Sequence, residues 1–215
     1  EWADFISFLA RLHKAIQAYP AYNVVPRKLI VAKRLAQCLN PALPSGVHQR
    51  ALDVYHHILS VVGPDGLRRD LHVWTSGLLP FFQYASTSVK PTLLAIYETF
   101  YLPLHDDLRP LTRALQMALL PGLEEETGEY FDRTIRLLDR ISDAVEPAYF
   151  LQNLWLTLIT TPSVRLAALN YLTRRMPDLT QHDDPTLLVG KDLGLMVRGL
   201  AHALDDDLLL VRRNT

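Results

Sequence analysis

Three clusters that combine histidine with aspartate are the residues in this sequence best suited by type to metal chemistry. They are His105-Asp106-Asp107, His182-Asp183-Asp184, and His202 followed by Asp205-Asp206-Asp207. Imidazole and carboxylate groups can hold a divalent ion that activates water, as in all-helical hydrolases of the HD type. Prolines adjoin two of the clusters, however, and aspartates at helix ends ordinarily cap helices or face solvent. We therefore interpret the clusters as caps and keep a metal-dependent HD-type hydrolase as the remote alternative.

Other signatures of catalysis are missing from the sequence. It contains no glycine-rich phosphate loop, no G-x-S-x-G nucleophile elbow and no H-E-x-x-H metal motif. Cys38 is the single cysteine, which rules out an intrachain disulfide and a cysteine-rich zinc site and fits a reducing, cytoplasmic compartment. The sequence thus predicts a protein that is not an enzyme and that uses no catalytic residue, cofactor or metal.

Basic residues are concentrated at the start of the chain, although its net charge is only −1. No Asp or Glu occurs between Phe5 and Leu52, whereas the second half of the chain is acidic. The near-neutral total gives no general case for binding nucleic acid. The basic side chains either converge on a surface for an acidic partner or anionic phosphoinositide membrane, or form a solvated edge, or pair with the acidic half. This candidate surface consists of Arg27, Lys28, Lys33, Arg34, His48 and Arg50.

Two segments could supply such a partner surface. The helix expected after Pro26 has a second, mixed face opposite its apolar stripe, and this face either packs against another repeat, the favoured interpretation, or binds a partner. The mixed face holds Arg27, Arg34, Ile30, Val31 and Cys38, and the stripe holds Leu29, Ala32, Leu35, Ala36 and Leu39. Aromatic residues also cluster in the segment 79–84, where core is the default and an exposed remainder would mark a partner groove.

A motif that pairs valine with a basic residue returns four times and indicates how the elements are organised. The copies are Val47-His48, Val89-Lys90, Val164-Arg165 and Val211-Arg212. In the first three copies, apolar residues follow at spacings of three and four, on one helical face. They are Ala51 and Tyr55, Leu93 and Tyr97, and Ala168 and Leu172. The intervals are 42, 75 and 47 residues, and 75 is close to two units with one unmarked copy between them. A period of roughly 40–47 residues is typical of stacked helix pairs of the HEAT or armadillo kind.

Nearly every segment of the chain has the pattern of an amphipathic or buried helix, and alternating strand patterns are absent. The predicted fold class is all-α, an α-solenoid-like array of about ten helices that forms a single helical-repeat domain over 1–215. No apolar run is long enough to span a bilayer. The first residues are neither a signal peptide nor a translation start, and the fourth motif copy is cut short. We expect a fragment of a much longer protein whose array continues beyond Thr215.

Several stretches closely resemble the N-terminal region of the Dopey family. The longest and most specific reads KRLAQCLNPALPSGVH, from Lys33 to His48. The others are Pro80–Ala85 through Ser88–Pro91, and Ala118–Glu126, and the opening Glu1–Asp4 and the pair Leu154-Trp155 fit as well. The resemblance covers essentially the whole chain.

The resemblance implies a role in membrane traffic. Dopey proteins are very large peripheral proteins on the cytoplasmic side of Golgi (trans-Golgi network) and endosome membranes, and they act in protein transport between these compartments. The family works with a giant Sec7-related scaffold and is linked to phospholipid flippases, to kinesin through its light chain, and to phosphoinositides. Its pattern contains no catalytic residues. We therefore expect a non-enzymatic adaptor or scaffold module that presents a surface to protein partners, with phosphoinositide binding by the basic helices as the alternative.

Overall fold

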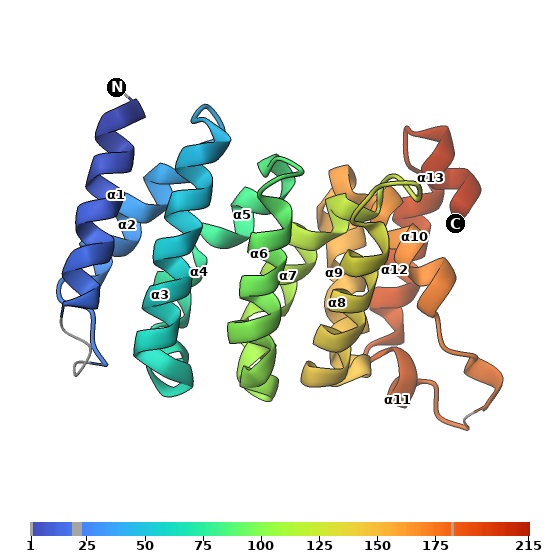
Figure 1. Ribbon diagram of the computed structural model, residues 1–215. Coiled ribbons are helices and arrows are strands. Elements are labelled where there is room, and N and C mark those ends of the chain that lie inside the picture. The colour runs from blue at the N-terminus through green and yellow to red at the C-terminus, as the bar shows by residue number, and fades with distance from the viewer. Residues whose placement is uncertain (1, 19–22, 182) are drawn as a thin grey trace. The chain divides into compact units, whose positions relative to one another are not determined.

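The computed structural model describes residues 2–18, 23–181 and 183–215, and within these ranges it contains helices and no strand (Figure 1). The all-α class is therefore confirmed, whereas the HEAT or armadillo stacking stays a prediction. The chain divides into two compact units, Glu1–Leu104 and His105–Thr215. A single repeat domain over 1–215 likewise stays a prediction. No helix in the part of the chain that the structure describes is long and apolar enough to cross a bilayer.

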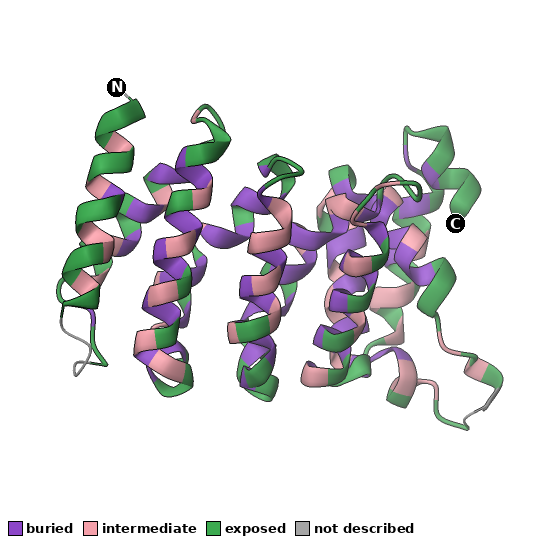
Figure 2. Ribbon diagram, in the orientation of Figure 1, coloured by how far each residue is buried: buried purple, intermediate pink, exposed green. Residues whose placement is uncertain are grey.

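The first unit is built around α3. Its helices are α1 (Trp2–Gln17), α2 (Lys28–Cys38), α3 (Ser45–Arg69), α4 (Leu71–Thr75), α5 (Leu78–Phe81) and α6 (Lys90–Ile96), with a 3-10 turn η1 (Phe82–Tyr84) after α5 and a π-helical turn η2 (Tyr97–Tyr101) after α6. Helices α1, α2, α4 and α6 all contact α3, which buries one face along its length (Figure 2). Helix α3 breaks at Gly63, whose φ of 65° is non-helical, and Pro64 opens its last turns.

A 3-10 segment, η3 (Leu102–Leu111), leads into the second unit and is interrupted at His105. The unit then contains α7 (Thr112–Leu119), η4 (Leu120–Leu123), α8 (Phe131–Val145), α9 (Pro147–Thr160), η5 (Pro162–Val164), α10 (Arg165–Arg175), η6 (Leu179–Gln181), α11 (Thr186–Val189), α12 (Leu193–Leu204) and α13 (Leu209–Asn214). The apolar helix α9 lies at its centre and contacts α7, α8, α10, α11 and α12. Trp155 of α9 is buried and donates its ring N–H to the carbonyl of Val189 at 2.9 Å, which holds α11 in place.

The four valines of the repeated motif occupy equivalent positions at the starts of helices. Val47, Val89, Val164 and Val211 are all buried, and so are the apolar residues that follow them in the first three copies. Three of the basic partners reach back to the preceding element. His48 bonds the carbonyl of Asn40 beyond α2, Lys90 lies over the Phe82 ring, and Arg165 bonds two carbonyls in the last turn of α9. The motif is thus a packing device: the valine anchors a new helix, and the basic residue ties it to the previous element.

Candidate functional site

Two of the six members of the predicted basic surface are engaged in contacts within the fold. Lys28 forms an ion pair with Asp70, which follows the last turn of α3. His48 is buried; its Nε2–H donates to the carbonyl oxygen of Asn40 at 2.8 Å, and its ring meets Phe81 edge-on at 4.7 Å. The prediction that His48 belongs to an exposed surface is therefore wrong. The reason is local: like the basic residues of two other motif copies, His48 points back at the preceding element, where it bonds the carbonyl of Asn40 that also accepts the N–H of Leu43.

The other four basic residues are exposed but face different directions. Arg27 precedes α2 as its N-cap, with a left-handed φ of 50°, and Arg34 within the helix donates to the side chain of Gln37 at 3.1 Å. Lys33 is turned about 100° from Arg34 around the helix. Arg50 belongs to a different helix, α3. A lipid-binding role for these residues stays a prediction.

The predicted apolar stripe of α2 is rotated in the structure. Its buried residues are Ala32, Leu35 and Cys38, with Leu39 just beyond the helix end, whereas Leu29 is 67% exposed. Ile30 is 56% exposed, so the outward face of α2 combines aliphatic and basic side chains. The expectation that Leu29 lies in the stripe and Cys38 opposite it was wrong, because α2 contacts both α3 and α4 and buries whatever lies between them.

A groove of about 440 Å³ runs along the C-terminal end of α2, and we name it the α2–α5 groove. One wall comes from α2 and the loop after it, and the other comes from the α4–α5 turn and η1. The first wall consists of Lys33, Ala36, Gln37, Leu39, Asn40 and Pro41, and the second of Ser76, Gly77, Pro80, Phe81 and Tyr84. Lys33 is the single charged residue among these lining residues. Nine of the eleven belong to the two stretches that resemble the Dopey family, 33–48 and 80–85.

Buried contacts hold the two walls of the groove together. His48 bridges them from below, since its ring bonds Asn40 of the first wall and packs on Phe81 of the second. Gly77 permits their close approach: a Cβ added there would lie 2.7 Å from the Cβ of Ala36 and 2.7 Å from the hydroxyl oxygen of Tyr55. The groove is therefore preformed, with an apolar floor and a rim that carries the ammonium of Lys33 and the ring of Tyr84, which is 57% exposed.

Two aspartates of the histidine and aspartate clusters are engaged in structural contacts. Asp184 accepts hydrogen bonds from the backbone N–H and hydroxyl of Thr186, and Asp206 pairs with the buried Arg165 at 2.7 Å. These bonds lower the pKa of both carboxyl groups. His105 and His202 are exposed, and His182, like Glu1 of the opening stretch, lies outside the described residues. Over 2–18, 23–181 and 183–215 no group of three or more His, Cys, Asp or Glu residues is placed to hold a metal ion.

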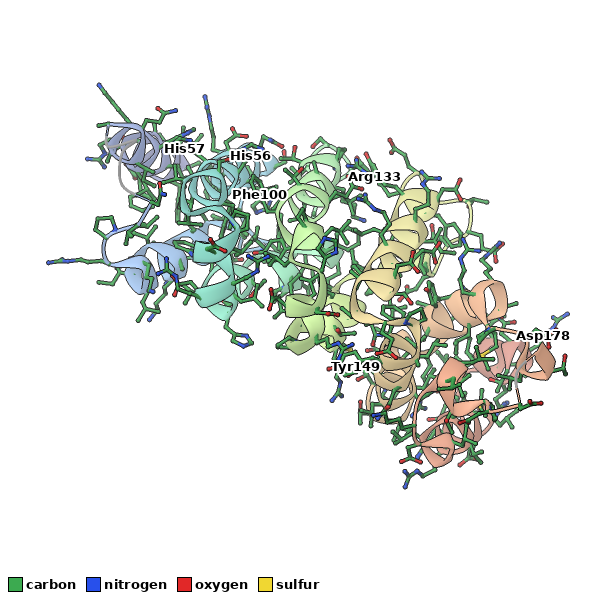
Figure 3. The ribbon with its side chains drawn as sticks, turned by 90° about the horizontal axis from the view of Figure 1, so that it is seen from below. His56, His57, Phe100, Arg133, Tyr149 and Asp178 are labelled. Carbon is green, nitrogen blue, oxygen red and sulfur yellow. The ribbon has the colours of Figure 1, made fainter. Side chains whose placement is uncertain are left out.

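The adjacent histidines of α3 turn to different neighbours, as the 100° step between them predicts. His56 packs edge-on against Phe100 with ring centroids 4.9 Å apart, and His57 lies 5.0 Å from the ring of His13 on α1 (Figure 3). Burial, together with the nearby His13 and His56, lowers the pKa of His57. Burial also raises the pKa of the Cys38 thiol to about 11, so it is protonated and unreactive at neutral pH. Neither feature resembles a catalytic group.

Sequence reasoning identified both stretches that line the α2–α5 groove but could not pair them. The exposed aromatic remainder that was expected to mark a groove is Tyr84, since Phe81 and Phe82 are buried. The position that it missed is Gly77. The sequence signal for it was weak: a lone glycine between two short apolar stretches, with no motif around it.

Comparison with known proteins supports the same family. The model of the N-terminal domain of Dopey matches residues 1–215. The chain is 45% identical to protein DOP1B of Mus musculus and 41% identical to the DOP1 homolog of Drosophila melanogaster, in both cases over 100% of this chain. It is 38% identical to protein DOP1 of Saccharomyces cerevisiae over 83% of this chain. The chain spans only 9%, 8% and 11% of the lengths of these relatives. No solved structure matches it. The chain therefore belongs to the Dopey family and corresponds to its N-terminal region.

Proposed function

We propose that this chain is a non-enzymatic adaptor module of vesicular protein transport between Golgi and endosomes, and that the α2–α5 groove is its contact for a protein partner. The observation that carries the proposal is the convergence of the two family-like stretches, which are 32 or more residues apart, on one preformed groove. Residues that only build a core would be buried. Here Lys33 and Tyr84 are exposed on the rim, and among the described residues neither has a hydrogen-bond or ion-pair partner.

The family membership supplies the cellular context of the proposal. Candidate partners are the Sec7-related giant scaffold, the kinesin light chain and a phospholipid flippase, and the site of action would be the cytoplasmic face of trans-Golgi network and endosome membranes. A catalytic role is disfavoured because the aspartates best suited to metal chemistry are bound to Arg165 and Thr186.

The test is partner association by the full-length protein carrying Tyr84→Ala or Lys33→Glu. Both residues are exposed, so the variants should keep wild-type helicity and thermal stability. We expect affinity capture of each candidate partner to fall at least about tenfold for Tyr84→Ala, because an aromatic anchor in a groove is a common hot spot. Lys191→Glu is the matched control, an exposed charge reversal in the second unit. Unchanged capture of all three partners would refute a role for the groove.

The outward face of α2 supports a second candidate function, attachment to anionic phosphoinositide membranes. Arg27 at the N-cap and Arg34 within α2 are exposed, as are Leu29 and Ile30, and this mixture of basic and aliphatic side chains suits a membrane interface. Sedimentation with phosphoinositide liposomes should then weaken steeply with salt and with the double change Arg27→Glu and Arg34→Glu. Liposome binding that changes neither with salt concentration nor with the double charge reversal would exclude this function.

A further inference from the structure

The chemistry of the α2–α5 groove also indicates what kind of partner it takes, and this inference rests on the groove being a protein contact. The walls contribute aliphatic, proline and aromatic surface, and no acidic residue lines them. Its volume of about 440 Å³ lies at the small end of the range typical of ligand sites, about 300–1,000 Å³. It is too small for the whole face of a partner helix and fits a few residues of extended chain.

Lys33, the single cation among the lining residues, indicates the charge of the partner. Lys28 is paired with Asp70, and Arg34 donates to Gln37. Lys33, by contrast, has no hydrogen-bond or ion-pair partner within the described ranges. The surrounding acid-free stretch, from Phe5 to Leu52, leaves its positive charge uncompensated by neighbours in sequence. An anionic group on the partner would form an ion pair with the ammonium of Lys33.

The identity of that anion follows from the geometry of the donors. Phosphate groups are recognised best by the planar, forked guanidinium of arginine, often in clusters. Lys33 offers a compact point charge, and the nearest arginine on the same helix, Arg34, is turned about 100° away and bonded to Gln37. A lone ammonium beside an apolar floor suits one carboxylate next to one apolar side chain.

The walls are already braced when the groove is empty. Phe81 and Phe82 are buried, and the backbone N–H of Ala85 bonds the carbonyl of Phe81 at 3.0 Å, which fixes the turn that carries Tyr84. His48 and Gly77 fix the distance between the walls. Binding therefore needs little ordering of the groove beyond its exposed rim side chains, which favours recognition of a short segment.

We propose that the α2–α5 groove binds a short extended peptide segment in which an apolar side chain enters between Leu39 and Tyr84 while a neighbouring Asp or Glu pairs with the ammonium of Lys33.

The proposal is tested with an array of dodecamer peptides, each with a central Leu or Phe and with Asp, Lys or Ala placed one to three residues away. Fluorescence polarisation on the best sequences gives their affinities for this chain. We expect Asp-containing peptides to bind more tightly than their Ala counterparts by roughly two- to fivefold, the effect of one solvent-exposed ion pair. Lys33→Glu should reverse the preference towards Lys-containing peptides, and Tyr84→Ala should weaken binding of all sequences alike.

Lys191→Glu is again the matched control, an exposed charge reversal outside the groove, and it should leave every affinity unchanged. Binding without preference for acid, or a preference that Lys33→Glu leaves in place, overturns the inference. The two levels of the proposal are separable. If Tyr84→Ala disrupts capture by the full-length protein but the peptides show no acid preference, the groove remains a protein contact and the acidic-peptide inference alone falls. If Tyr84→Ala leaves both peptide binding and capture unchanged, both fall.

Discussion

Replacing Arg165 by methionine should be among the most damaging single changes in the second unit. The guanidinium is almost enclosed, with 8% of the residue exposed, and makes three bonds. Its Nη1 donates to Asp206 at 2.7 Å, and its Nε and Nη2 donate to the carbonyls of Leu158 and Ile159 at 2.7 and 3.3 Å. Methionine retains most of the packing of the stem but leaves a carboxylate, itself only 6% exposed, without its cation. Such removal costs about 3–5 kcal/mol.

The loss should depend on pH in a defined direction. The bonds from Arg165 and from the N–H of Leu208 lower the pKa of Asp206 in the folded state. The stability that ionised Asp206 contributes to the folded state is therefore fully present above the unfolded pKa of about 3.9, and it is lost as pH falls through the folded pKa. In the Arg165→Met variant the buried carboxyl group has lost its main partner, so protonation relieves it. The stability gap between wild type and variant should be widest near pH 7 and shrink towards pH 3.

Urea unfolding followed by far-UV circular dichroism measures this gap, provided that the m-values of the two proteins agree. The double variant with Asp206→Asn should be more stable than Arg165→Met alone, because it no longer buries an unpaired charge. Arg213→Met is the control: this arginine is exposed in the last turn of α13, so its effect should stay within about 0.5 kcal/mol. A loss below about 1 kcal/mol for Arg165→Met at pH 7, or a double variant no more stable than the single one, would refute the reasoning.

Three further predictions follow from the first unit. Gly77→Ala should cost about 1–3 kcal/mol in urea unfolding, because its Cβ would overlap the Cβ and Cα of Ala36; full stability would show that the walls can separate. The pKa of His57 is lowered in the folded state, so the stability of the unit should fall as pH drops from about 6.5, the unfolded value, through the folded pKa. His57→Gln should make stability depend less on pH, as measured by urea midpoints at pH 7 and 5.5. Cys38, with its pKa raised to about 11, should resist iodoacetamide at pH 8 until the chain is unfolded by urea; rapid labelling of the native protein, measured by mass spectrometry, would contradict its burial.

Local features of the fold followed from the sequence because they depend on neighbours along the chain. Gly63-Pro64 ends the regular part of α3 whatever packs against it, since the conformation of Gly63 and the missing N–H of Pro64 are properties of the backbone. The valines of the repeated motif are buried as their spacing predicts, and the two stretches that line the groove were identified as the most family-specific and the most aromatic.

The tertiary structure decided which faces are covered and which distant residues meet. Helical spacing groups residues on a face, but two neighbouring helices selected the buried side of α2, so Leu29 lies outside and Cys38 inside. His48 has the residue type of a surface cation, yet the carbonyl of Asn40 eight residues earlier draws it into the core. The groove required Ala36 and Gly77 to touch across 41 residues of sequence. Sequence alone determined an all-helical Dopey-family chain with no catalytic motif; only packing between distant segments could bring Lys33 and Tyr84 to one groove, because such contacts leave no periodic signal in the chain.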